Sequence, residues 1–287
     1  MERSFNFKYD LITSRQNPLV MYACKLAEKK HRQKEGKFRL DGIKLCKEAF
    51  ESGVEIETVF VMESAQKEVF ESIGDFLMDA AEKNIDVKVV SDGVFEKISE
   101  EKAPQGVICI ARRIDKFHKI ATINNVQEII EPLLDSADSV FAVESVRDPG
   151  NLGTIIRSAT AFGVDCLLIS SDCAELYNPK TIRAAMGALF KQRIVIVDKL
   201  DVAISLFSKY GRRAYAAALS RESEMLGSML LSRRDCIVVG NEGHGLSNEL
   251  ISACDGSLFI PMTPNAESLN AAIASSICMW EQFGSNL

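Results

Sequence analysis

The chain has 287 residues, of which 47% are hydrophobic and 26% charged, and its formal net charge is −6 at pH 7. This length exceeds the ~100–150 residues of a typical domain and predicts two domains, each with its own core. No apolar stretch reaches the ~18–20 residues that cross a bilayer, and the N-terminal segment lacks the apolar core of a signal peptide. We therefore expect a cytoplasmic protein without a membrane partner.

Basic residues are concentrated at the start of the chain. The first 50 residues hold twelve lysines and arginines against six acidic residues, a local charge of +6, so the remainder carries −12. A local positive field predicts a polyanionic partner such as RNA, although a solvated helix face would produce the same pattern. The candidate RNA-binding residues are Arg15, Lys29, Lys30, Arg32, Lys37 and Arg39.

The first half of the chain has the signals of a small α/β domain. Residues 17–51 predict a helix, a turn centred on Gly36, a short strand and a second helix that Gly53 closes. Further along, the patterns predict strands near 56–62, 85–90 and 106–112 and helices near 65–82 and 92–99. We assign residues 1–115 to this small α/β domain with its basic surface, and residues 116–135, which lack strong strand signals, to a linker that carries at most a short helix.

Strand and helix signals alternate regularly over residues 136–287. The predicted strands are 139–144, 166–170, 193–197, 213–218, 235–239 and 257–260, and the predicted helices are 151–162, 178–190, 201–210, one from about 246, and 268–283. This alternation predicts an α/β domain with a mostly parallel sheet that helices cover on both faces. Ligands of such sheets bind beyond the carboxyl ends of the strands.

Eight cysteines are scattered along the chain without the paired spacing of a metal site. Several of them lie within apolar runs. We interpret them as buried, reduced thiols and predict no metal.

Three polar motifs follow or flank predicted strands of the second half, and we expect them to form one active site. Motif 1 is DPGNLGTIIRSA (148–159), motif 2 is VVGNEGHGLS (238–247) and motif 3 is IPMTPNAESLNAAIA (260–274). The glycines of motif 2 indicate a tightly bent backbone, but they form neither a dinucleotide-binding fingerprint nor a phosphate-binding loop. A dehydrogenase or a kinase is therefore disfavoured.

Each motif also has a purely structural interpretation. Motif 1 could be an ordinary strand-to-helix turn with Asn151 as the helix cap and Arg157 on the surface. His244 of motif 2 is better explained as a polar loop residue than as a catalyst. Ser268 of motif 3 is predicted to cap the terminal helix.

In their order and spacing, the motifs resemble those of the SpoU/TrmH branch of the SPOUT RNA methyltransferases. The shared patterns are N-x-G-x-x-x-R, G-N-E-G-x-G, and S-L-N-x-x-x-A after a proline-rich turn, and the resemblance covers about residues 139–283. The N-terminal half is similar to the ribosomal-protein-like substrate-binding domain that often precedes this catalytic domain. That similarity rests on SRQNP (14–18), the basic helix-turn and APQGVICIA (103–111).

The resemblance implies a trefoil-knotted catalytic domain over residues 136–287 that binds S-adenosylmethionine and methylates a ribose 2′-hydroxyl of RNA. Ribosomal RNA is favoured over tRNA, and the family's homodimers place an arginine from the partner chain in the active site. The implied cofactor contacts are Gly240, Asn241, Gly243, Ile260, Met262, Ser268 and Leu269. The implied catalytic residues are Asn151, Arg157, Glu242, Ser268 and Asn270.

The chemistry of these side chains suggests a division of roles. A guanidinium with a pKa above ~12 rarely gives up its proton, so we expect Arg157 to hold the adjacent phosphate and orient the 2′-oxygen rather than act as a base. Glu242 is expected to fix Arg157 or motif 2, and Asn151 and Asn270 to hold these groups in register. The apolar terminal helix offers a dimer contact or, alternatively, internal core.

Two further hypotheses remain open at this stage. One is an RNA-binding module without catalysis, which would not bind S-adenosylmethionine. The other is a relative that methylates a base, which nucleoside analysis of the product would identify.

Overall fold

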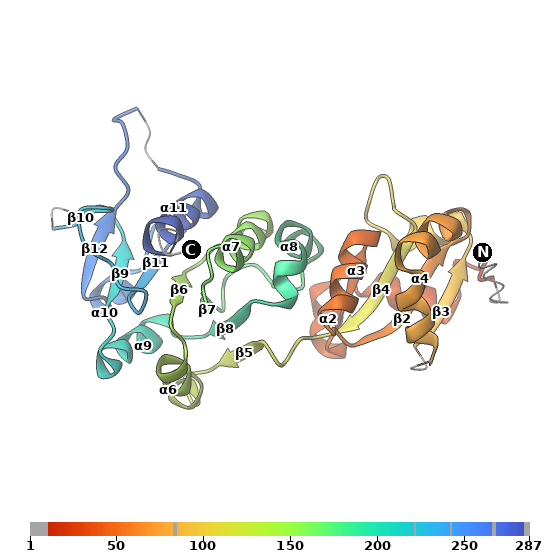
Figure 1. The fold of residues 1–287 in the computed structure, drawn as a ribbon, viewed down its shortest axis with the longest axis horizontal. Coiled ribbons are helices and arrows are strands. Elements are labelled where there is room, and N and C mark those ends of the chain that lie inside the picture. Colours follow the sequence, from red (N-terminus) through yellow and green to blue (C-terminus); the bar gives the residue numbers. More distant parts are fainter. Residues whose placement is uncertain (1–10, 83–84, 221, 242, 266–267, 284–287) are drawn as a thin grey trace. The chain divides into compact units, whose positions relative to one another are not determined.

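The computed structural model describes residues 11–82, 85–220, 222–241, 243–265 and 268–283 (Figure 1). The chain divides into two compact units between Ile114 and Asp115. This two-part architecture, with a large parallel sheet in the second part, confirms the predicted α/β class and the mostly parallel sheet.

The first unit is built on a four-stranded mixed sheet. Its strands, in spatial order, are β1 (Lys37–Asp41), β4 (Val107–Arg112), β2 (Ile56–Met62) and β3 (Asp86–Val90). β4 is antiparallel to both of its neighbours, whereas β2 and β3 are parallel. The helices are α1 (Pro18–Lys25), α2 (Lys29–Glu35), α3 (Ile43–Glu51), α4 (Gln66–Glu82) and α5 (Asp92–Ile98). A core that includes Val20, Phe60 and Phe95 joins α1 and α5 to the sheet.

The second unit is built on eight strands, and every described strand pair in it is parallel. The spatial order is β10 (Glu224–Met225), β12 (Gly256–Phe259), β9 (Ala214–Ala217), β11 (Cys236–Val239), β6 (Val140–Val143), β7 (Cys166–Ser170), β8 (Arg193–Val197) and β5 (His118–Ala121). The central strands are completely buried, as expected for a parallel sheet with two covered faces.

Helices cover both faces of this sheet. They are α6 (Val126–Ser136), α7 (Pro149–Ala161), α8 (Pro179–Ala185), α9 (Leu200–Ser205), α10 (Asn248–Ala253) and α11 (Ala271–Phe283). Figure 1 shows α6, α9 and α10 on one face and α7, α8 and α11 on the other. The helices predicted at 178–190 and 201–210 each continue as a short 3-10 turn after α8 and α9.

Residues 116–135, predicted as a linker, differ from that expectation. β5 pairs with β8 along the whole strand, and α6 buries Val126, Ile130 and Leu134 in the core of the second unit. β5 is a four-residue edge strand with its two central residues exposed, so its sequence lacks the continuous apolar pattern of the inner strands. The sheet, rather than a local signal, gives β5 its structure.

A glycine permits the close crossing of α7 and α8. A Cβ atom built on Gly153 would lie 2.5 Å from the Thr181 carbonyl oxygen and 2.6 Å from the Ala184 Cβ. Both atoms belong to a packed helix and cannot move aside without shifting it. Gly153 of motif 1 therefore serves the packing of α7, which carries Asn151 and Arg157.

We expect Gly153→Ala to lower the free energy of unfolding by about 1–3 kcal/mol, because overpacking forces the two helices apart. Chemical denaturation followed by circular dichroism measures the change. Gly93→Ala is the matched control, since its added methyl meets only the Arg15 guanidinium at 3.5 Å and Gly93 lies within α5. This control should be neutral or stabilising. Equal midpoints for Gly153→Ala and the unmodified chain would contradict the close crossing.

Candidate functional site

A cavity of about 620 Å³ lies at the carboxyl ends of β9, β11 and β12. The last residues of these three strands, Ala217, Val239 and Phe259, line it. This is the edge at which parallel α/β sheets bind ligands. Of the residues predicted to contact a cofactor, the cavity is lined by Gly240, Asn241, Ile260, Met262, Ser268 and Leu269.

The walls of the cavity are mainly apolar. Leu246, Leu258 and Leu269 contribute side chains, and polar groups come from Asn241 and Ser268 among others. Its volume falls within the ~300–1,000 Å³ of ordinary small-molecule sites. The cavity can therefore hold a flat, apolar-faced group with hydrogen-bonding edges.

Motif 2 forms a closed turn at one wall of this cavity. The backbone N–H of Asn241 donates to the Gly245 carbonyl at 3.1 Å, and the Gly245 N–H donates back at 2.9 Å. A Cβ on Gly240 would lie 2.4 Å from the carbonyl carbon and oxygen of Gly245. Only glycine fits at this position, which accounts for the tightly bent backbone expected from the sequence.

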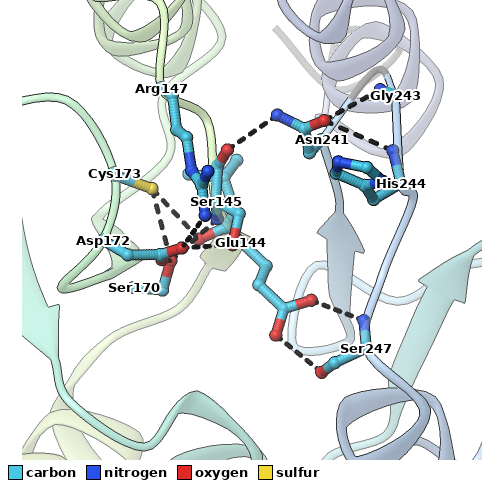
Figure 2. Close-up of polar contacts among 11 residues, drawn as sticks. Glu144, Ser145, Arg147, Ser170, Asp172, Cys173, Asn241, Gly243, His244 and Ser247 are labelled. Atoms are coloured by element: carbon cyan, nitrogen blue, oxygen red, sulfur yellow. Dashed lines mark hydrogen bonds and ion pairs between the residues drawn. The ribbon is translucent and has the colours of Figure 1, made fainter.

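The side chain of Asn241 ties this turn to the neighbouring strand (Figure 2). Its Oδ1 accepts from the backbone N–H of Gly243 at 2.8 Å and of His244 at 3.3 Å, and its Nδ2 donates to the Ser145 carbonyl at 2.9 Å. Gly243 thus supports the turn through Asn241 and is not among the residues that line the cavity.

A second polar network lies at the carboxyl ends of β6 and β7, and the sequence analysis did not single it out. The Ser145 N–H donates to Ser170 Oγ at 2.8 Å, and the Ser145 hydroxyl donates to Asp172 Oδ2 at 2.6 Å. Glu144 accepts from the backbone N–H and the hydroxyl of Ser247, the cap of α10. The only signal available in the sequence was that Glu144 and Ser170 end two predicted strands and that Ser145 and Asp172 follow them.

Motifs 1 and 3 meet through two asparagines. Asn270 Nδ2 donates to Asn151 Oδ1 at 2.9 Å, and Asn270 Oδ1 accepts from the backbone N–H of Ala272 at 2.9 Å. Asn270, rather than the predicted Ser268, therefore caps α11. The cap of α7 is Asp148, which accepts from the Asn151 N–H at 2.8 Å, so Asn151 itself does not cap that helix.

Of the predicted catalytic residues Arg157 and Glu242, the structure describes the position of Arg157 alone. Arg157 is exposed on α7 and does not line the cavity. Six residues of α-helix separate it from Asn151, about 9 Å along the axis and about 120° around it. Glu242 lies outside the described residues, so its contact with Arg157 stays a prediction.

The six candidate RNA-binding residues fall into two groups. Arg15, Lys29 and Lys30 are exposed, and Lys37 is half-buried in an ion pair with Glu57.

The prediction that Arg32 and Arg39 bind RNA is wrong, because both side chains are buried. Arg32 is 4% exposed and donates to the carbonyls of Leu26 and Ala27 after α1, while Arg39 is 8% exposed and donates to the Ile98 carbonyl and to Glu100. A sequence count of charges does not distinguish an arginine that satisfies backbone carbonyls from one that faces solvent.

Six of the eight cysteines are buried, as the sequence predicts, whereas Cys24 and Cys254 are only partly buried. All eight cysteines are free, and burial raises the pKa of the Cys166 thiol to about 12 and that of Cys173 to about 11. Within the described ranges, no group of three or more His, Cys, Asp or Glu could hold a metal ion. No described helix is long and apolar enough to cross a membrane.

Each of the two units matches a known protein family. Residues 138–280 match the SpoU rRNA Methylase family, and residues 17–109 match the MRM3-like substrate binding domain. The chain is 28% identical over 273 residues to the 23S rRNA (guanosine(2553)-2′-O)-methyltransferase of Bacillus subtilis, covering 95% of this chain and 99% of that relative. It is also 28% identical to the mitochondrial rRNA methyltransferase 3A of Danio rerio, covering 96% and 70% respectively.

A solved structure extends this similarity to the whole fold. The AdoMet-bound rRNA methyltransferase from Sinorhizobium meliloti matches with a TM-score of 0.78 at 27% identity, covering 97% of this chain and 99% of that one. Fold and site together thus define a two-domain methyltransferase. The chain belongs to the SpoU rRNA methylase family, with an MRM3-like substrate-binding domain ahead of the catalytic domain, as the motifs predicted.

Proposed function

We propose that this protein transfers a methyl group from S-adenosylmethionine to a ribose 2′-hydroxyl of RNA, most directly ribosomal RNA. The observation that carries the proposal is the convergence of the three motifs. Motifs 2 and 3 line one cavity, and the Asn270–Asn151 hydrogen bond brings motif 1 to motif 3. The named activities of the relatives in Bacillus subtilis and Danio rerio support an rRNA substrate.

The cavity fits S-adenosylmethionine by size and by chemistry. Apolar side chains such as Leu246 and Leu269 suit the faces of adenine, and the backbone at Gly240 and Ile260 offers donors and acceptors for its edges. When bound, this cofactor supplies a methyl group on a cationic sulfur, which is the electrophile. The AdoMet complex of the similar enzyme from Sinorhizobium meliloti supports this assignment.

The chain's own residues position the acceptor. Asn270 and Asn151 hold the start of α11 and the start of α7 in register. Ser268, exposed at the cavity, and Glu242 are proposed as further polar groups of the catalytic set. Arg157 contributes by holding the phosphate next to the reacting sugar with its guanidinium, which aligns the 2′-oxygen.

Arg157 acts in the active site of a partner chain. Asn151 faces motif 3 of its own chain, and a residue about 120° further round α7 points elsewhere. The terminal helix supplies an apolar face for such a dimer, since Ile273, Ile277 and Trp280 are 52%, 37% and 57% exposed. These side chains lie three or four residues apart, on one side of α11.

The first unit supplies electrostatic attraction to RNA through Arg15, Lys29 and Lys30, with Lys37 beside Glu57 as a weaker contributor. Two further features belong to the proposal. The trefoil knot of the catalytic domain is proposed on the family resemblance, and the cytoplasmic location is proposed from the amino-acid sequence. Tracing the backbone of an experimental structure and microscopy of the tagged protein, respectively, test them.

The first prediction concerns catalysis. Arg157→Ala should reduce methyl transfer by about 10²-fold or more, while the affinity for S-adenosylmethionine in calorimetry stays unchanged, because Arg157 does not line the cavity. Arg193→Ala, at an exposed arginine on the amino end of β8, is the control and should keep full activity. Mass analysis of the RNA nucleosides should show a 2′-O-methylated ribose. A methylated base, or the absence of cofactor binding, would refute the assigned activity.

The second prediction concerns the dimer. Ile273→Glu should convert the protein from dimer to monomer in sedimentation, because it places a charge in the apolar face. Mixing inactive Arg157→Ala and Asn270→Ala chains should restore about a quarter of the normal activity, since half of the dimers are mixed and each has one intact site. A monomeric unmodified chain at micromolar concentration, or no restored activity, would rule out the shared site.

The third prediction concerns RNA binding. Replacing Lys29 and Lys30 together by Gln should reduce the slope of log affinity against log salt by about 1.5, since each lost phosphate contact removes ~0.7–0.9. Filter binding over a salt series measures the slope. Lys67→Gln on α4, where the lysine side chain is 88% exposed, is the matched control. If the double variant at Lys29 and Lys30 gave the same slope as Lys67→Gln, these two lysines would be excluded from the RNA interface.

A further inference from the structure

Ser145 has an unusual backbone conformation directly after β6. Its φ is +56°, and the only other described non-glycine residue with a positive φ is Met186. A serine in the left-handed region is strained by about 1–3 kcal/mol and persists where its surroundings hold it there. The hydrogen bonds of Ser145 therefore show which neighbouring residues hold it in this conformation.

Every polar group of Ser145 has a hydrogen-bond partner, and the partners lie on the two neighbouring strands (Figure 2). On one side, its N–H donates to Ser170 Oγ and its hydroxyl donates to Asp172 Oδ2, both at the end of β7. On the other side, its carbonyl accepts from Asn241 Nδ2, just after β11. Ser145 thus joins the carboxyl ends of three adjacent strands, β11, β6 and β7.

Asp172 fixes the orientation of Ser145. Its other oxygen, Oδ1, accepts from the Ser170 hydroxyl at 2.6 Å, so one carboxylate holds both serines. Burial disfavours the charged carboxylate, but the hydrogen bonds from Ser145 and Ser170 and the proximity of Arg147 outweigh it and keep the pKa of Asp172 below its usual value. The carboxylate is therefore an acceptor at neutral pH.

The carbonyl of Ser145 in turn fixes the amide of Asn241. Two backbone N–H groups of motif 2 require the amide oxygen on one side, so the amide NH₂ must face an acceptor on the other. In its left-handed conformation, Ser145 directs its carbonyl to Asn241 and provides that acceptor. Asn241 lines the cavity, whereas neither Ser145 nor Asp172 does.

We propose that Ser145, held by Asp172, is a positioning residue for S-adenosylmethionine: it sets the amide of Asn241 and so the shape of the motif 2 turn. The proposal rests on the proposed function of the cavity. It assigns Asp172 and Ser145 an effect on cofactor affinity although both lie outside the cavity.

The test compares Ser145→Gly with Ser145→Ala by calorimetric titration with S-adenosylmethionine. Glycine adopts a positive φ without strain and keeps both backbone hydrogen bonds, so its affinity should stay within about threefold of the unmodified chain. Alanine keeps the strain but loses the hydroxyl that Asp172 holds, so affinity should fall roughly tenfold. If Ser145 had no positioning role, the order of affinities would differ. Ser145→Ala would then bind S-adenosylmethionine at least as tightly as Ser145→Gly, because alanine is the smaller change to the backbone.

A second pair of variants addresses Asp172. Asp172→Ala should weaken cofactor binding in the unmodified chain and weaken it less in the Ser145→Gly background, where no hydroxyl remains to be held. This comparison decides the question even if Ser145→Ala does not fold. The matched control is Ser171→Ala, an exposed neighbouring serine whose hydroxyl makes no hydrogen bond within the described ranges. It should leave affinity unchanged.

The outcomes separate this proposal from the proposed function. If the unmodified chain does not bind S-adenosylmethionine, the proposed function fails. If it binds, and Ser145→Ala binds as tightly as Ser145→Gly or more tightly, the positioning role fails while the function stands. Equal effects of Asp172→Ala in both backgrounds would overturn the role of Asp172. The expected order of affinities, with thermal midpoints that do not follow it, supports the proposal.

Discussion

The parallel direction of all described strands in the second unit is the constraint on which the site depends. It brings the carboxyl ends of β6, β7, β9, β11 and β12 to one edge, so that loops more than 90 residues apart in the chain become neighbours. At this edge the loops are not held by apolar packing alone. Side-chain amides and carboxylates connect several of these loops through hydrogen bonds to backbone groups, from Asn241 to the Ser145 carbonyl and from Glu144 to the Ser247 N–H.

Two asparagines carry most of this connection. Asn241 joins the motif 2 turn to the end of β6, and Asn270 joins the start of α11 to the start of α7. An amide is suited to this task because it donates and accepts at the same time and therefore has one correct orientation. The cavity consequently has a defined shape before any ligand enters, which reduces the ordering that binding requires.

The glycines of the motifs have two distinct physical roles. Gly240 allows the motif 2 backbone to close on itself beside the cavity, whereas Gly153 allows α7 to cross α8. Both would otherwise place a Cβ inside another residue's van der Waals radius. The motif pattern alone marks both as important, but only the packing shows that one shapes the ligand site and the other positions the helix that carries Arg157.

The sequence by itself determined the order of most elements and the parallel second sheet, because periodicity is a local signal. Its three motifs identified the family by resemblance, and motifs 2 and 3 contain most of the residues that line the cavity. It did not determine whether Arg32 and Arg39 face solvent, which residue caps α7 or α11, or that β5 joins the sheet. Nor did it identify Ser145 and Asp172. The burial of Arg39, the place of β5 in the sheet and the contacts of Ser145 depend on partners distant in sequence, such as Ile98 for Arg39 or Asn241 for Ser145. Only the folded chain creates those contacts, so only the tertiary structure decided them.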